Sequence, residues 1–100
     1  DPLAVGLYPD AMRRVAAETG TPLLDVFASS QQLYRTLGTE DSHHLFMHLP
    51  KNGHPNYPDG ISDDTHFCTQ GARQIAALVA TAIEQSSECV GLQMHLKRSE

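Results

Sequence analysis

The chain has 100 residues, of which 40% are hydrophobic and 19% charged, and its formal net charge is −5. Such a composition is typical of an ordinary globular domain and excludes a wholly disordered chain. The acidic balance excludes a nucleic-acid partner, which needs a basic face, and no apolar run approaches the ~20 residues of a membrane span.

The first predicted element is a helix that begins at Tyr8, after a loop formed by residues 1–7. Proline suits the first helical turn, where its missing N–H would have no partner, and Asp10 favours the positive end of the helix dipole. Gly20 fits the position just past the helix end, and Pro22 makes continuation unfavourable.

Residues 21–27 form a short apolar run between turn signals. This pattern predicts a buried strand of a parallel sheet, with proline tolerated at its start. Asp25 would then stand at the carboxyl end of the strand, the edge where α/β proteins bind ligands, but a solvated or capping acid is the preferred interpretation. Ser29 or Ser30 is expected to cap a helix over residues 31–37 that Gly38 ends.

Asp41 or Ser42 is expected to cap a further short helix that reaches about Met47. Residues 48–62 hold three prolines, two glycines and two asparagines, which predicts a long loop. The apolar stripe after Cys68 predicts a final helix that ends near Ile83. Because this helix separates Cys68 from Cys89, both cysteines are predicted to be free thiols.

The chemistry of the chain concentrates in residues 62–72, which we expect to be a loop that enters the final helix. Asp63 stands three residues before His66, and a carboxylate at that spacing can accept the Nδ1–H of the imidazole ring. This contact would leave Nε2 free to take a proton from a nucleophile. The adjacent Asp64 is interpreted as a surface acid near the helix.

Histidines before this stretch raise the alternative of a metal site. His44 and His48 are four residues apart, which on a helix would put both rings on one face, and Asp41 offers a third ligand. Leu45 stands where a zinc protease of the H-E-x-x-H type would have glutamate. We therefore assign no metal and no other cofactor, and interpret these histidines, with His43 and His54, as a polar loop.

One predicted strand among several helices indicates the closing part of an α/β domain, and several blocks of the sequence carry a family resemblance. These blocks are residues 8–12, 22–26, 45–48 and 63–67, then Gly71, Ala72, Ile75 and Ala76, and the tail 91–97. Together they resemble the C-terminal part of SGNH (GDSL-type) hydrolases, nearest to the rhamnogalacturonan acetylesterase-like branch. The resemblance extends over nearly the whole chain.

The resemblance implies that residues 1–100 are the C-terminal segment of a single three-layer α/β/α, flavodoxin-like domain, whose parallel sheet is mostly supplied by preceding sequence. It implies a serine esterase acting on acetyl or short acyl esters of carbohydrates, with Asp63 as the orienting acid and His66 as the general base. No Gly-Asp-Ser nucleophile block occurs among the 100 residues, so the isolated chain is expected to be inactive.

Two other readings stay open at this point. The chain can be a non-catalytic binding domain that retains the shape, or, as a third choice, a zinc-dependent hydrolase. The expected partners are a carbohydrate ester and either the preceding part of the domain or a second copy, with no nucleic acid and no membrane. The first residues show no secretory signal, but this absence decides nothing if the sequence begins within a longer protein. The compartment, secreted or cytoplasmic, therefore stays open.

Overall fold

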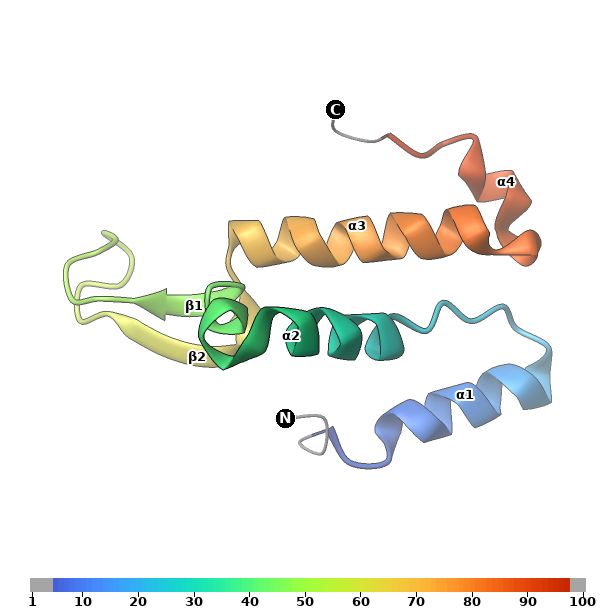
Figure 1. The fold of residues 1–100 in the computed structure, drawn as a ribbon, viewed down its shortest axis with the longest axis horizontal. Coiled ribbons are helices and arrows are strands. Elements are labelled where there is room, and N and C mark those ends of the chain that lie inside the picture. The colour runs from blue at the N-terminus through green and yellow to red at the C-terminus, as the bar shows by residue number, and fades with distance from the viewer. Residues whose placement is uncertain (1–4, 98–100) are drawn as a thin grey trace. The chain divides into compact units, whose positions relative to one another are not determined.

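A computed structural model describes residues 5–97 of the protein and, within that range, gives a mixed α/β arrangement of helices and one two-stranded antiparallel sheet (Figure 1). None of the helices in these residues combines the length and the apolar composition that crossing a bilayer requires. The elements in chain order are α1 (Tyr8–Thr19), α2 (Val26–His43), β1 (Phe46–Leu49), β2 (Ile61–Phe67), α3 (Thr69–Gln85), the 3₁₀ turn η2 (Ser87–Cys89) and α4 (Val90–Gln93).

The chain divides into two compact units. One comprises the described parts of Asp1–Gln31 and Leu78–Glu100, and the other comprises Gln32–Ala77. The second unit holds the hairpin of β1 and β2 and every residue of the candidate site, so the two units are described separately.

In the first unit, α1 has the bounds that its sequence predicts. A proline occupies its first turn, and Gly20 ends it in the left-handed conformation at φ 68° while donating its N–H to the carbonyl of Ala16. Glycine adopts this conformation without the steric cost that a Cβ brings. Proline and glycine therefore set the two ends of α1 locally, which is why the sequence alone was sufficient to place it.

The predicted strand at residues 21–27 is wrong. Residues 21–25 have no regular structure, and Val26 begins α2. The Oδ1 atom of Asp25 accepts the N–H of Ala28 at 3.0 Å, so Asp25 is the capping acid that starts this helix. A parallel strand needs a neighbour to share its hydrogen bonds, and no described segment pairs with these residues.

A second contact fixes Asp25 at this helix start. Arg13 of α1 donates from Nε and Nη2 to the two carboxylate oxygens, at 2.8 and 3.2 Å. The hydrogen bond from Arg13, followed by that from the Ala28 N–H, holds the pKa of Asp25 below its ordinary value. The capping role preferred for Asp25 is thus confirmed, although Asp25 caps a helix rather than ending a strand, and it is also an ion-pair partner.

Ser29 and Ser30 lie inside α2 rather than at its cap. Their hydroxyls donate to the carbonyls of Val26 and Phe27, three residues back, at 3.2 and 2.9 Å. Gly38 interrupts the helix as predicted, with φ 81° and ψ 177°, and the helical turns that follow it end at His43. The short helix expected through Met47 is also wrong, because Phe46–Leu49 is strand β1.

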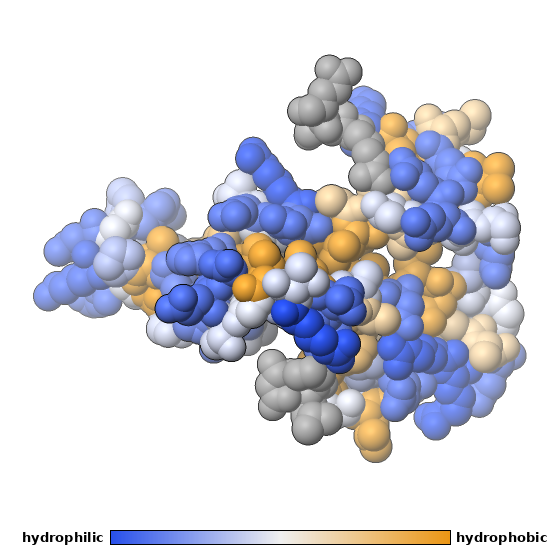
Figure 2. Space-filling model, viewed as in Figure 1, coloured by the Kyte–Doolittle hydropathy of each residue, from blue (hydrophilic) through white to orange (hydrophobic). Residues whose placement is uncertain are grey.

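The hairpin of β1 and β2 takes over the two ends of the long loop predicted at residues 48–62, and the middle of that prediction is confirmed. The loop proper is confined to residues 50–60, and β2 continues through residues 61–67, including the stretch expected to be a loop. The two strands lie side by side with the connecting loop at their far end (Figure 1). That end of the hairpin carries mainly hydrophilic residues, as Figure 2 shows at its left.

The hairpin is joined to the start of α3 through Leu45, the most deeply buried apolar side chain among the described residues at 1% exposure. Cys68 donates its backbone N–H to the carbonyl of Leu45 at 3.0 Å. A Cβ atom added to Gly71 would lie 1.9 Å from the same carbonyl oxygen, so only glycine permits this approach. Gly71, near the end of the stretch at residues 62–72, therefore has a packing role.

α3 confirms the predicted final helix. After it, the tail forms η2 and α4, and its apolar residues Val90, Leu92 and Met94 are exposed. The Gln93 side-chain amide donates to three carbonyls at the end of α3, those of Ile83, Glu84 and Ser86, at 3.0 to 3.2 Å. These contacts hold α4 against the C-terminal end of α3. Both cysteines are free thiols, as predicted.

The predicted fold class is therefore supported only in its coarser part. Helices combine with a small sheet, but the described residues contain an antiparallel hairpin and no parallel sheet. Neighbouring strands of a parallel sheet need a long crossover between them, whereas β1 and β2 are joined directly by the loop at residues 50–60 and pair antiparallel.

Candidate active site

A bulge in β2 creates the candidate site. Leu49 to Met47 pair in order with Ile61 to Asp63, but the next residue of β1, Phe46, pairs with Phe67. Residues 64–66 therefore have no opposite partner on β1, and the backbone must turn out of the ladder there. The rings of Phe46 and Phe67 stack with their centroids 5.1 Å apart, and this contact holds the strands together on the far side of the bulge.

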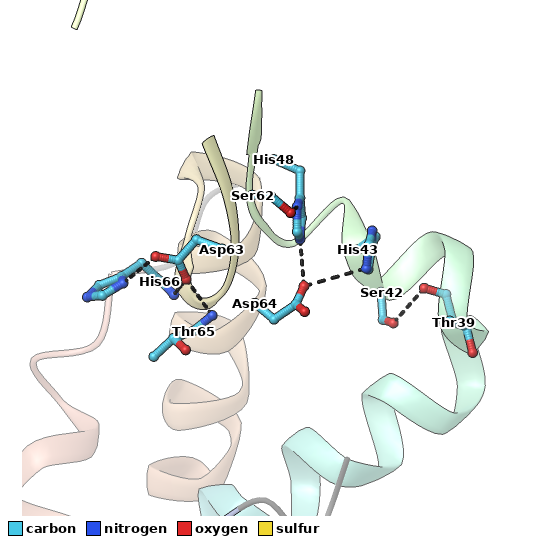
Figure 3. A network of polar contacts seen from close by, with 9 residues as sticks. All are labelled: Thr39, Ser42, His43, His48, Ser62, Asp63, Asp64, Thr65 and His66. Atoms are coloured by element: carbon cyan, nitrogen blue, oxygen red, sulfur yellow. Dashed lines mark hydrogen bonds and ion pairs between the residues drawn. The ribbon is translucent and has the colours of Figure 1, made fainter. Parts of the chain in front are cut away.

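Asp63, the last paired residue before the bulge, holds the turned backbone. Its Oδ1 atom accepts the N–H of Thr65 at 2.6 Å and that of His66 at 2.8 Å (Figure 3). An aspartate that accepts the N–H groups two and three residues later replaces the hydrogen bonds of the strand ladder. The bulge is thus encoded by the side chain that precedes it.

The other carboxylate oxygen of Asp63 contacts the imidazole of His66, with Oδ2 at 2.8 Å from Nδ1. Hydrogen bonds from the backbone N–H of His66 and of Thr65, followed by the contact with the His66 ring, lower the pKa of Asp63 to about 2. Asp63 is therefore ionised at neutral pH and can only accept, so the ring proton of His66 must be on Nδ1. In this arrangement Nε2 points away from the carboxylate and has no partner among the described residues, and the His66 side chain is 78% exposed.

We call this pair the Asp63–His66 dyad. A carboxylate that fixes the tautomer and orientation of an imidazole is what a hydrolase uses to let Nε2 take a proton from a nucleophilic hydroxyl. The predicted spacing thus brings the two residues into contact, although on a strand bulge rather than on a loop. No serine hydroxyl forms a hydrogen bond with His66 in the described residues.

Asp64 turns to the other side of β2 and meets two histidines. Its Oδ1 atom lies 2.6 Å from Nε2 of His48 and 3.5 Å from Nε2 of His43. The two imidazole rings stack with their centroids 4.2 Å apart, and Nδ1 of His48 lies 3.3 Å from the hydroxyl of Ser62 (Figure 3). We call His43, His48 and Asp64 the histidine–carboxylate cluster.

The cluster corrects one expectation from the sequence and adds to another. His44 and His48 do not share a helix face, because His44 follows the end of α2 and His48 is on β1. Asp64 is exposed, as expected of a surface acid, but it has specific partners. The pairing of β1 with β2 brings them together, and the Asn-Gly and Asp-Gly steps of the intervening loop, typical of hairpin turns, were the signal for it.

Comparisons with known proteins found two relatives of this chain. The chain is 48% identical over 81 residues to the rhamnogalacturonan acetylesterase RhgT of Bacillus subtilis, a match that covers 81% of this chain and 35% of that protein. It is 33% identical over 81 residues to the probable rhamnogalacturonan acetylesterase YesY of the same organism, covering 78% of this chain and 33% of that protein.

The chain is thus homologous to part of the rhamnogalacturonan acetylesterases, which are SGNH hydrolases, and the resemblance seen in its sequence is confirmed. It spans about a third of the length of the curated relatives it matches. No family profile matches the chain. No solved structure matches it either.

Proposed function

We propose that this chain is the C-terminal segment of a carbohydrate acetylesterase and supplies the acid and base of its catalytic triad. The substrate class would be acetyl or other short acyl esters of a polysaccharide such as acetylated rhamnogalacturonan. In this proposal His66 is the general base and Asp63 the orienting acid. The nucleophilic serine and the oxyanion donors come from sequence outside these 100 residues.

The observation that carries the proposal is the state of the Asp63–His66 dyad. Its carboxylate receives two backbone N–H groups and one imidazole N–H within 2.6 to 2.8 Å, so it is rigid and ionised. A general base must have the correct tautomer before the nucleophile arrives, and a held Nδ1–H supplies it. The homology to rhamnogalacturonan acetylesterases supports the choice of acyl-transfer chemistry.

The dyad would act twice in the reaction. His66 Nε2 takes the proton of the serine hydroxyl as its oxygen bonds to the acetyl carbon, and then gives it to the departing sugar oxygen. In the second half a water loses its proton to Nε2 as its oxygen bonds to the acetyl carbon, and Nε2 returns that proton to the serine oxygen as acetate leaves. Asp63 stabilises the imidazolium that forms in each step and keeps its charge throughout.

A segment exchange tests this proposal. The 81 matching residues of RhgT are replaced by those of this chain, and deacetylation of acetylated rhamnogalacturonan is measured against the parent. We expect an active chimera that loses at least ~10²-fold in kcat on His66→Ala, the low end of the effect of removing a catalytic base. A second, narrower exchange covers residues 61–72 alone. Chimeras that fold like the parent, by thermal melting, yet release no acetate would refute the esterase reading and favour a binding domain.

The isolated chain is expected to be inactive on aryl acetates beyond the level of free imidazole. The reason is that no nucleophile contacts His66 within the described residues. A burst of product that depends on His66 would show that a serine of this chain has been overlooked.

A further inference from the structure

The histidine–carboxylate cluster lies on the opposite side of the β2 bulge from the dyad, and the proposed esterase chemistry does not use it. We propose that His43, His48 and Asp64 bind a divalent transition-metal ion of the zinc class, with solvent at the remaining coordination position. The proposal is independent of the esterase function, because none of the three residues belongs to the dyad.

The spacing of the donor atoms fits such an ion. The three side chains each offer one ligand atom, and these atoms lie within 4.8 Å of one another. Ligand atoms about 2.0–2.2 Å from a tetrahedral zinc ion are separated from one another by about 3.3–3.6 Å. The contact of Asp64 Oδ1 with His43, at 3.5 Å, lies in this range, and the 2.6 Å contact with His48 has to lengthen by about 1 Å to admit the ion.

The chemistry of the donors selects the class of metal. Two imidazole nitrogens and one carboxylate oxygen suit zinc, cobalt or nickel, whereas magnesium and calcium prefer oxygen ligands throughout. Asp64 and His43 are exposed, with side-chain accessibilities of 73% and 56%, so a water molecule can complete the coordination. His48 is the enclosed ligand, at 21%.

Ser62 provides the outer contact that metal-binding histidines commonly have. Its hydroxyl lies 3.3 Å from Nδ1 of His48 and can either donate or accept. When the ion takes the lone pair of Nε2, the ring proton moves to Nδ1 and is donated to Ser62, so this hydrogen bond is kept. The His43 ring, which stacks on His48, has to turn out of the stack for its own Nε2 to reach the ion.

The ligands come from three separate elements. His43 ends α2, His48 lies on β1 and Asp64 lies on the bulge of β2. An ion bound to all three would join the helix end to both strands and restrain residues 64–66 without touching the dyad. A ligand that binds only the folded arrangement stabilises it by mass action.

Isothermal titration of the 100-residue chain with zinc chloride tests the site. We expect one saturable equivalent and at least ~10-fold weaker binding in His48→Gln and in Asp64→Asn, which each remove a ligand. Ser62→Ala should weaken binding by ~10-fold, at the low end of outer-contact effects. His44→Gln is the matched control, since His44 is adjacent to His43 but outside the cluster, and its affinity should not change.

Two outcomes overturn the site. One is the absence of saturable zinc binding, and the other is an equal loss in His44→Gln, which would mean that any histidine of the chain binds zinc. His43→Gln is a second ligand variant for the case that His48→Gln does not fold. His43 is exposed at the helix end, so its substitution should leave the fold intact. In ¹⁵N spectra of the histidine rings, zinc should shift the Nε2 signals of His43 and His48 and leave that of His44 in place.

Discussion

Asp63 and Asp64 are neighbours on one strand, yet their carboxylates belong to two different groups of residues. The Asp63 carboxylate contacts its own strand, where it holds Thr65 and His66, two and three residues later in the sequence. Asp64 faces the histidines of α2 and β1, the nearer of which is 16 residues away in sequence. Two chemically identical side chains thus have different partners because they project to opposite sides of the bulge.

The two groups also differ in how firmly each is held. Asp63 is 23% exposed and accepts two backbone N–H groups, whereas Asp64 is 73% exposed and contacts side chains only. A carboxylate held by backbone donors has one orientation, which general-base catalysis requires. An exposed carboxylate beside two imidazoles can move by about an ångström, which metal coordination tolerates. The difference predicts that substitutions at the two positions have separate consequences.

The largest effect is expected from Asp63→Asn in the active chimera with RhgT. The amide cannot hold His66 in the tautomer with Nδ1–H, so kcat should fall by at least ~10²-fold. Steady-state deacetylation of an acetylated sugar measures it, with KM determined separately. A fall smaller than that of Asp64→Asn would reverse our assignment of the orienting acid.

The next largest effect is expected on the stability of the packing between α3 and the hairpin, which carries both Asp63 and Asp64. Gly71→Ala places a Cβ against the Leu45 carbonyl, where 1.9 Å is available, and must displace the start of α3 from the hairpin. Overpacking of this kind costs about 1–3 kcal/mol of unfolding free energy, which urea denaturation measures. Gly91→Ala is the matched control, because nothing lies within 4 Å of its added Cβ. Equal stability of the two variants would show that α3 does not depend on this approach.

A smaller effect is expected in the first unit, away from both carboxylate groups. Asp25→Ala removes the cap of α2 and the partner of Arg13 and should lower the unfolding free energy by about 1 kcal/mol. Because the pKa of Asp25 is below its ordinary value in the folded chain, this contribution is present at neutral pH. It is lost as the pH falls below about 4, where the unfolded carboxyl takes up its proton first.

Denaturation of the wild type and Asp25→Ala at pH 7 and pH 3 measures this contribution. The difference in stability should shrink at the lower pH, while zinc binding at pH 7 and chimera activity should be the same in both chains. A difference that grows on acidification would contradict the ion pair and cap seen at Asp25.

The smallest effect is expected from Asp64→Asn on catalysis. With zinc removed by a chelator, kcat of the chimera should stay within about tenfold of the parent, since an exposed acid contributes ~1 kcal/mol or less. The same variant should lose its zinc binding. Loss of activity without loss of zinc binding would place Asp64, and not Asp63, beside the catalytic histidine.

Helix ends and short-range contacts were the parts of the fold that could be predicted from the sequence. Pro9 and Gly20 act on their own turns of the chain, so α1 was placed correctly at both ends. The run at residues 21–27 was misread because a buried strand and an apolar linker share the same composition. Which of the two forms depends on the segments that lie beside residues 21–27 in space, and the sequence of these residues does not specify those segments.

The candidate site divides in the same way. The sequence by itself determined that Asp63 and His66 meet, because a spacing of three residues with a turn between them confines both side chains to one place. Only the tertiary structure decided where Asp64 points. Its partners depend on the register of β1 against β2, and a shift of that register by one residue would turn each side chain to the other face. The turn signals in residues 50–60 indicate a hairpin but leave its register open, so the sequence alone does not specify the histidine–carboxylate cluster.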